Sequence, residues 1–214
     1  MKTIFYILAV LVPLAVTAQK EDKAKALLDE VYQKVKSYDN IYIDFKYALQ
    51  NPRENINQET RGNVTLKGDK YHFNYMGVTK IFDGKKSYTI IPENEEIIVE
   101  SAETEEENTI SPSGMLTFYR NGYKYEWGEL KNVKGRKIQY VKLIPIDTHA
   151  EVTHILLGID AQTKHIYQLT ETGKNNTRTV ITVTGFKTNQ PVSDKLFTFN
   201  TKKYKDEGYY IVRN

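Results

Sequence analysis

The sequence predicts a mainly β protein with a single domain, built on one continuous antiparallel sheet with helices packed against it. Most of the chain after residue 40 alternates apolar and polar residues, as strands with one buried face do. Short turns separate these segments at regular intervals, which is typical of an antiparallel meander. No linker rich in Pro, Gly or Ser and no internal repeat divides the chain.

Residues 1–18 have the pattern of a secretory signal peptide. Lys2 precedes the apolar run "IFYILAVLVPLAV", and Ala18 supplies the small residue before the expected cleavage point at Gln19. The run contains Pro13 and is shorter than the roughly 20 residues that span a bilayer, which argues against a membrane anchor. We therefore expect residues 19–214 to form a soluble, exported domain.

The charge balance and the lack of cysteine exclude several classes of protein. The formal net charge is +3 from 30 basic and 27 acidic residues, whereas nucleic-acid-binding domains usually carry a clustered basic face. The chain contains no cysteine, so it is not itself a bacterial lipoprotein and has no disulfides, although export permits them. Its stability must come from packing.

Residues 21–38 form the clearest predicted helix. Acidic Glu21 and Asp22 begin it, and Lys34 and Lys36 end it, which suits the helix dipole. Its apolar residues recur at the spacing of one helical face, and they are Ala24, Leu27, Leu28, Val31, Val35 and Tyr38. This stripe predicts a helix packed on the sheet.

Strands are predicted along the rest of the chain, with turns at Gly68-Asp69 and Asp83-Gly84. The expected segments are 41–49, 62–75, 79–92, 95–101, 123–130, 136–145, 153–160, 164–172, 178–186 and 195–200.

Two interruptions separate the early strands from the later ones. Residues 102–108 are acidic but lack the Asp/Asn alternation and the glycine of a calcium-binding loop, so we interpret them as a solvated loop. Residues 111–122 then predict a short apolar helix, with Ser111 as N-cap and Pro112 at the first helical position. A helix that apolar must lie on a hydrophobic surface.

Large aromatic residues alternate along one predicted strand face, at Tyr71, Phe73 and Tyr75. An ordinary core strand carries Val, Ile or Leu at such positions. Aromatic rings offer a wide apolar area and lose little rotamer entropy when they are buried. The pattern therefore favours the wall of a cavity over a dry core, although exposed sheet faces also collect tyrosine.

Motifs of known catalytic sites are absent from the sequence. The four histidines, His72, His149, His154 and His165, show no metal-binding spacing. There is no GxSxG elbow and no thiol nucleophile. Glu126 and Glu129 flank Trp127 as glycosidase carboxylates can, but an alternating strand explains them as outward polar residues. We expect no enzymatic activity, no metal and no cofactor.

The order of these parts resembles the LolA family of periplasmic outer-membrane lipoprotein carriers, from about Ala24 to Tyr204. The resemblance rests on the opening "LL…Y.KV.SY…I..DF", on the strand that begins at Gly62, and on "FDGKKSYTIIP", "SPSGML" and "VSDKLFTFN". Each motif is loose alone, and their order and spacing together are more specific.

The resemblance implies an unclosed, strongly curved antiparallel β-barrel whose helices form a lid over the concave face. It implies a periplasmic carrier, monomeric and without hydrolytic activity, that shelters the acyl chains of lipoproteins in an apolar cavity. An inner-membrane lipoprotein-releasing ABC transporter would load this carrier, and an outer-membrane acceptor of unknown identity would receive the cargo.

The cavity wall is expected to draw on both helices and on the sheet, with Tyr88 and Ile90 on the neighbouring strand and on the same concave face as Phe73. The candidate acyl-chain-binding residues are Leu28, Val31, Val35, Phe45, Tyr71, Phe73, Tyr75, Tyr88, Ile90, Met115, Leu116, Tyr119 and Trp127.

One departure from the family pattern concerns the closure of the lid. The best-known members carry an Arg-Pro pair just before the aromatic alternation, and that arginine helps to hold the lid shut. This sequence has Lys67-Gly68 at the matching positions, and lysine lacks the bidentate fork of arginine. Lys67 is therefore the candidate latch, with weaker expected closure.

Two other functions remain open at this point. Related half-barrels occur in sigma-factor regulators, which bind partner proteins and usually carry a further domain. A general carrier of free lipids is equally consistent with an apolar cavity, because water avoidance does not depend on what the acyl chain is attached to.

Overall fold

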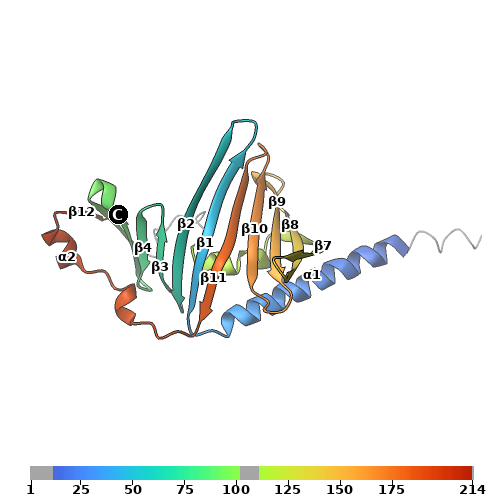
Figure 1. Ribbon diagram of the computed structural model, residues 1–214, viewed down its shortest axis with the longest axis horizontal. Helices are drawn as coiled ribbons and strands as arrows, with labels where there is room; N and C mark the ends of the chain where they lie inside the picture. Colours follow the sequence, from blue (N-terminus) through green and yellow to red (C-terminus); the bar gives the residue numbers. More distant parts are fainter. Residues whose placement is uncertain (1–11, 102–110, 214) are drawn as a thin grey trace, which may run out of the picture. The chain divides into compact units, whose positions relative to one another are not determined.

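The computed structural model describes residues 12–101 and 111–213, which contain two α-helices and a 12-stranded sheet (Figure 1). The helices are α1 (Val12–Lys36) and α2 (Thr201–Asp206), and the 3-10 helices are η1 (Pro92–Asn94), η2 (Gly114–Leu116), η3 (Phe118–Arg120) and η4 (Asp194–Phe197). The strands are β1 (Ile41–Asn51), β2 (Ile56–Lys67), β3 (Lys70–Tyr75), β4 (Val78–Phe82), β5 (Lys86–Ile91), β6 (Glu96–Ser101), β7 (Tyr123–Val133), β8 (Arg136–Pro145), β9 (Val152–Asp160), β10 (Ile166–Gly173), β11 (Arg178–Thr188) and β12 (Tyr210–Arg213).

Hydrogen bonds connect the strands in the order β12-β6-β5-β4-β3-β2-β1-β11-β10-β9-β8-β7. Over the described ranges, β12 and β7 are not neighbours, so the sheet is open. Successive strands from β1 to β6 and from β7 to β10 pair antiparallel. The expected class, a mainly β fold on an unclosed antiparallel sheet, is confirmed. The lid of helices stays a prediction.

Two compact units make up the chain. Unit 1 comprises residues 1–35 and 119–179, and unit 2 comprises residues 36–118 and 180–214. Strand β11 begins in unit 1 and continues in unit 2. The expected boundary between a cleaved segment 1–18 and a domain 19–214 stays a prediction, and residues 1–11 lie outside the described residues.

Helix α1 belongs almost wholly to unit 1, together with strands β7 to β10 (Figure 1). Its predicted stripe is buried from Ala24 to Val31. Glu30 forms an ion pair with Lys164, with 2.8 Å between Oε2 and Nζ, and the Arg120 guanidinium lies 3.8 Å from the centre of the Tyr32 ring. The predicted helix is thus confirmed, although it begins earlier, at Val12. None of the described helices is long and apolar enough to cross a membrane.

A buried carboxylate fixes the β9–β10 turn of unit 1. Asp160 accepts backbone N–H groups from Gln162 and Thr163, each at 2.9 Å, and the Arg136 Nε at 2.7 Å. Burial alone would raise the pKa of Asp160, but the hydrogen bonds from Thr163, Arg136 and Gln162 outweigh it and hold the pKa below its usual value. The ionised carboxylate therefore stabilises the fold.

In unit 2, the strand register separates two faces of the sheet. Ile43, Val64 and Phe73 occupy matching positions on β1, β2 and β3, and we call their side the Phe73 face. His72, Ile81 and Tyr88 match across β3, β4 and β5, and we call the opposite side the Tyr88 face. Adjacent residues of a strand point to opposite faces, so these two sets cannot mix.

The Tyr88 face holds a compact core. Its buried residues are Ile81, Ile90, Ile97 and Val99, and the partly buried residues packed on them are Tyr88, Phe199, Tyr204, Tyr209 and Ile211. The last four come from the C-terminal segment. Through these residues, the C-terminal segment covers the apolar strands β4 to β6. Within the segment, Asn200 caps α2 by accepting the backbone N–H of Lys203.

Three elements of the structure differ from the sequence-based expectations. The helix expected over 111–122 is instead the short turns η2 and η3, because glycine, serine, threonine and aromatic residues favour the α-helix weakly. The strand expected over 195–200 is wrong: η4, whose N-cap Ser193 accepts the N–H of Lys195, ends at Phe197, and residues 198–200 are in neither a helix nor a strand. Strand β12 was not expected, and it pairs parallel with β6. The acidic run 102–108 lies outside the described residues.

Gly62 marks a close approach on the Phe73 face. It pairs with Phe45 on β1 and with Tyr75 on β3. A Cβ atom at Gly62 would collide with the Phe45 ring and would lie 2.6 Å from the Asn74 carbonyl oxygen. A side chain at this position therefore requires both neighbours to move.

We predict that Gly62→Ala destabilises the protein by about 1–3 kcal/mol, because the added methyl group overpacks the site. Urea unfolding followed by circular dichroism measures this change, and near-ultraviolet circular dichroism reports the displaced Phe45 ring. Thr60→Ala, on the same strand and face, is the matched control. Equal stability of Gly62→Ala and the wild type would contradict the close approach.

We further predict that Asp160→Asn lowers the free energy of unfolding at neutral pH by about 2 kcal/mol, because two N–H donors and Arg136 lose a charged acceptor. The folded-state pKa is depressed, so this stabilisation is present above the unfolded-state pKa and is lost as the pH falls through the folded-state value, below about pH 4. Urea unfolding measured from pH 7 downward should show the free energies of unfolding of the wild type and Asp160→Asn converging in acid, with the exposed Asp69→Asn as control. A difference between them that stays constant with pH would contradict this prediction.

Candidate functional site

Four aromatic side chains form a continuous patch on the Phe73 face of unit 2. We call Phe45, Tyr47, Phe73 and Tyr75 the aromatic patch. Phe45 stacks on Phe73 with centroids 5.9 Å apart, and Tyr75 lies 6.0 Å from Phe73 and 6.1 Å from Phe45. Tyr47 meets Tyr75 edge to face at 5.5 Å. Since β2 separates β1 from β3, the rings meet only because Gly62 has no side chain between them.

The aromatic patch is partly exposed, unlike the core beside it. All four of its side chains have intermediate exposure. Tyr71, two residues before Phe73, is only 1% exposed and stacks on Phe82 at 5.5 Å. Burial, and then the neighbouring Tyr47, raise the pKa of Tyr75, so its hydroxyl stays neutral. The patch therefore offers an uncharged, accessible apolar surface next to a fixed core.

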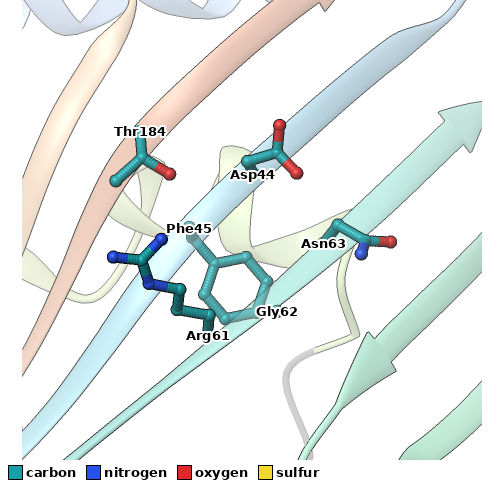
Figure 2. A pocket seen from close by; sticks show the side chains of 6 residues that line it. All are labelled: Asp44, Phe45, Arg61, Gly62, Asn63 and Thr184. Carbon is teal, nitrogen blue, oxygen red and sulfur yellow. The ribbon is translucent and has the colours of Figure 1, made fainter.

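A hollow of about 340 Å³ lies beside Asp44 and Asn63, which pair on the sheet face opposite to the aromatic patch (Figure 2). Its volume is at the lower end of ligand-pocket sizes. It is lined by Asp44, Phe45, Arg61, Gly62, Asn63 and Thr184. Asp44, Arg61 and Asn63 alternate with Phe45 and Gly62 along their strands, so these charged and amide side chains lie on the sheet face opposite to the Phe45 ring (Figure 2).

A second hollow of about 210 Å³ shares Arg61, Gly62 and Asn63 with the first. It extends along residues 74–79, between β3 and β4. A chain of hydrogen bonds crosses these strands, from the Thr79 hydroxyl to Asn74 at 2.8 Å and from the Asn74 amide to Asn63 at 2.9 Å. These bonded polar groups lie on the sheet face opposite to the aromatic rings.

Of the expected cavity residues in unit 2, the structure brings Phe45, Phe73 and Tyr75 together. Tyr88 and Ile90 were expected on the same side, and this placement is wrong. Tyr88 pairs with Ile81, which pairs with His72, so both Tyr88 and Ile90 lie on the Tyr88 face. The turn between β4 and β5 sets this register, and a shift of one residue exchanges the faces.

The other candidate residues occupy two different environments. In unit 2, Met115 in η2 is 36% exposed and Leu116 is half-buried. In unit 1, the buried residues are Leu28, Val31 and Tyr119, and the partly exposed ones are Val35 and Trp127. Their contact with an acyl chain stays a prediction.

Lys67, the candidate latch, pairs with the C-terminal segment of unit 2. Its Nζ lies 2.8 Å from Asp194 Oδ1 in η4, and the hydrogen bond from Lys67 lowers the pKa of Asp194. Exposed ion pairs contribute little to stability. The pair lies where η4 meets the end of β2, and the role of Lys67 in closing a lid stays a prediction.

Sequence reasoning missed Tyr47 and Gly62. Tyr47 continues the alternation Ile41, Ile43, Phe45, which is a signal that was available. The role of Gly62 depends on which strands flank β2, and a single strand does not show this.

The described residues contain no group of three or more His, Cys, Asp or Glu that could hold a metal ion.

The family model described as "Outer membrane lipoprotein carrier protein LolA" matches residues 35–200. A search of curated protein sequences found no match. Among solved structures, an uncharacterized conserved protein from Thermus thermophilus is 9% identical, with a TM-score of 0.56 over 90% of this chain and 99% of that chain.

Two further solved structures match at low identity. The lipoprotein LppX of Mycobacterium tuberculosis is 12% identical, with a TM-score of 0.53 over 81% of this chain and 98% of that chain. A LolA superfamily protein from Nitrosomonas europaea is 12% identical, with a TM-score of 0.43 over 82% of this chain and 97% of that chain. The family match covers most of the chain, and the chain therefore belongs to the LolA family of outer membrane lipoprotein carrier proteins.

Proposed function

We propose that this protein is a periplasmic carrier that shelters the acyl chains of lipoproteins and moves them from the inner to the outer membrane. The observation that carries the proposal is the aromatic patch, whose four partly exposed rings form one apolar surface in a member of the LolA family. An apolar surface that stays accessible in a folded protein usually marks a binding site.

The energetics of acyl chains explain why such a carrier is needed. Each buried methylene contributes roughly 0.8 kcal/mol, so a chain of about sixteen carbons represents on the order of 12 kcal/mol of water avoidance. A lipoprotein cannot cross an aqueous compartment unaided against that cost. Rings with few rotatable bonds shelter the chain at a small entropic cost, and neutral tyrosine hydroxyls tolerate water when the cargo leaves.

The remaining parts of the proposal follow from family membership. Residues 1–18 direct export, an inner-membrane lipoprotein-releasing ABC transporter loads the carrier, and an outer-membrane acceptor takes the cargo. Transfer of this kind involves no covalent step, so it requires neither a cofactor nor a catalytic residue.

Mass spectrometry of the protein purified gently from its native periplasm tests the proposal directly. Acylated peptides or intact lipoproteins in near-stoichiometric amount are the expected result. Free phospholipid or fatty acid alone would replace the proposal with a general lipid carrier. Co-purification of an anti-sigma protein without lipoprotein would replace it with a regulatory module, and an empty protein that refuses added lipoprotein would overturn it.

We predict that Phe73→Glu weakens binding of a fluorescent diacylated lipopeptide at least about tenfold, because a carboxylate in the aromatic patch must lose its water when the acyl chain binds. A fluorescence titration measures the affinity, and circular dichroism verifies that the variant is folded.

Leu130→Glu is the matched control for this prediction. Leu130 lies on strand β7 of unit 1, is well exposed, and lines neither the aromatic patch nor the two hollows described above. We expect this variant to keep the wild-type affinity. Wild-type binding by Phe73→Glu would remove the aromatic patch from the proposed site.

A further inference from the structure

Strand β12 forms one end of the sheet in unit 2. Its four residues pair with β6 on one side, in the register Tyr210↔Glu96 to Arg213↔Val99. No strand among the described residues lies on its other side. An open edge of this kind presents backbone donors and acceptors to solvent, and extended peptides bind proteins by adding a strand to such edges.

The hydrogen-bond pattern identifies which backbone groups face outward. The Tyr210 N–H donates to the Glu95 carbonyl oxygen at 2.7 Å, so Tyr210 is directed toward β6. In a parallel ladder, alternate residues of a strand bond to the same neighbour. Val212 is therefore also directed toward β6, while Ile211 and Arg213 direct their N–H and C=O groups to the open side.

The side chains of β12 add an apolar and a basic component to this edge. Tyr210 is 80% exposed and Val212 is 39% exposed, although strands usually bury such residues. Beside them lies a hollow of about 370 Å³, lined by Lys205, Gly208, Tyr209, Tyr210, Ile211 and Arg213. Two of these residues are basic and none is acidic, so the hollow complements a carboxylate.

We propose that β12 is a docking edge for an extended, acidic segment of a partner protein. The segment adds a strand along Ile211 and Arg213, and its carboxylates face Lys205 and Arg213 across the hollow. The exposed Tyr210 ring packs on its apolar side chains. This edge is separate from the aromatic patch, so the inference does not depend on the nature of the cargo.

Nuclear magnetic resonance of the ¹⁵N-labelled full chain tests the proposal with defined probes. The first probe is a blocked hexapeptide of alternating valine and glutamate, and the second alternates valine and lysine. We expect the acidic peptide to shift the amide signals of Ile211 and Arg213 saturably, and to bind at least about tenfold more tightly than the basic one. Equal affinities, or shifts confined to other strands, would overturn the proposal.

A third probe separates strand addition from plain charge attraction. It is the acidic peptide with one central valine N-methylated, which removes a backbone donor without altering its charge. We expect its affinity to fall about tenfold, and unchanged affinity would refute strand pairing. Shifts of the same amides that appear on raising the protein concentration without peptide would mean that a second copy occupies the edge, which also overturns the proposal.

Matched variants test the contribution of the basic residues. Lys205→Glu with Arg213→Glu should weaken binding of the acidic peptide at least about tenfold and reverse the preference between the two peptides. Lys195→Glu with Lys202→Glu changes the net charge equally, at exposed residues that do not line the hollow, and should bind as the wild type does. Equal losses in both pairs would reduce the effect to net charge and overturn the assignment.

Discussion

The contact between the Phe45 ring and the bare backbone of Gly62 determines the chemistry of the Phe73 face. Aromatic rings on β1 and β3 are separated by β2, and they meet because the middle strand offers no side chain between them. The result is an aromatic surface that is continuous across three strands. Its rings contact one another and remain partly exposed. A carrier of flexible apolar chains needs a surface of this kind.

The two faces of unit 2 differ in how far their apolar residues are covered. On the Tyr88 face, the C-terminal segment covers Ile81, Ile90 and their neighbours, and this burial stabilises the fold. On the Phe73 face, Tyr71 is buried while Phe73 and Tyr75 remain partly exposed. A sheet that is stabilised from one side can leave apolar residues accessible on the other. This difference explains how the folded protein keeps aromatic rings partly exposed to water.

Membership of the LolA family and the aromatic patch support the same function from independent directions. The family match comes from the pattern of the sequence over residues 35–200, and the patch comes from ring distances in the folded chain. The aromatic patch itself consists of neutral rings. Such a surface suits a ligand that binds through buried apolar area. A second apolar surface that competes for the ligand could then release it.

The sequence by itself determined the local periods of this protein. The spacing of Leu28 and Val31 predicted the buried face of α1, and the alternation around Phe73 predicted an aromatic strand face. The tertiary structure decided which strands lie together and which residues share a face. Tyr88 was misplaced because the register across a hairpin depends on turn geometry. Strand β12 escaped notice because its four residues carry too short a pattern, and its parallel pairing with β6 depends on the route of the whole C-terminal segment. Local periodicity depends on residues that are close in the sequence, whereas register and edge pairing depend on contacts between segments far apart in the chain.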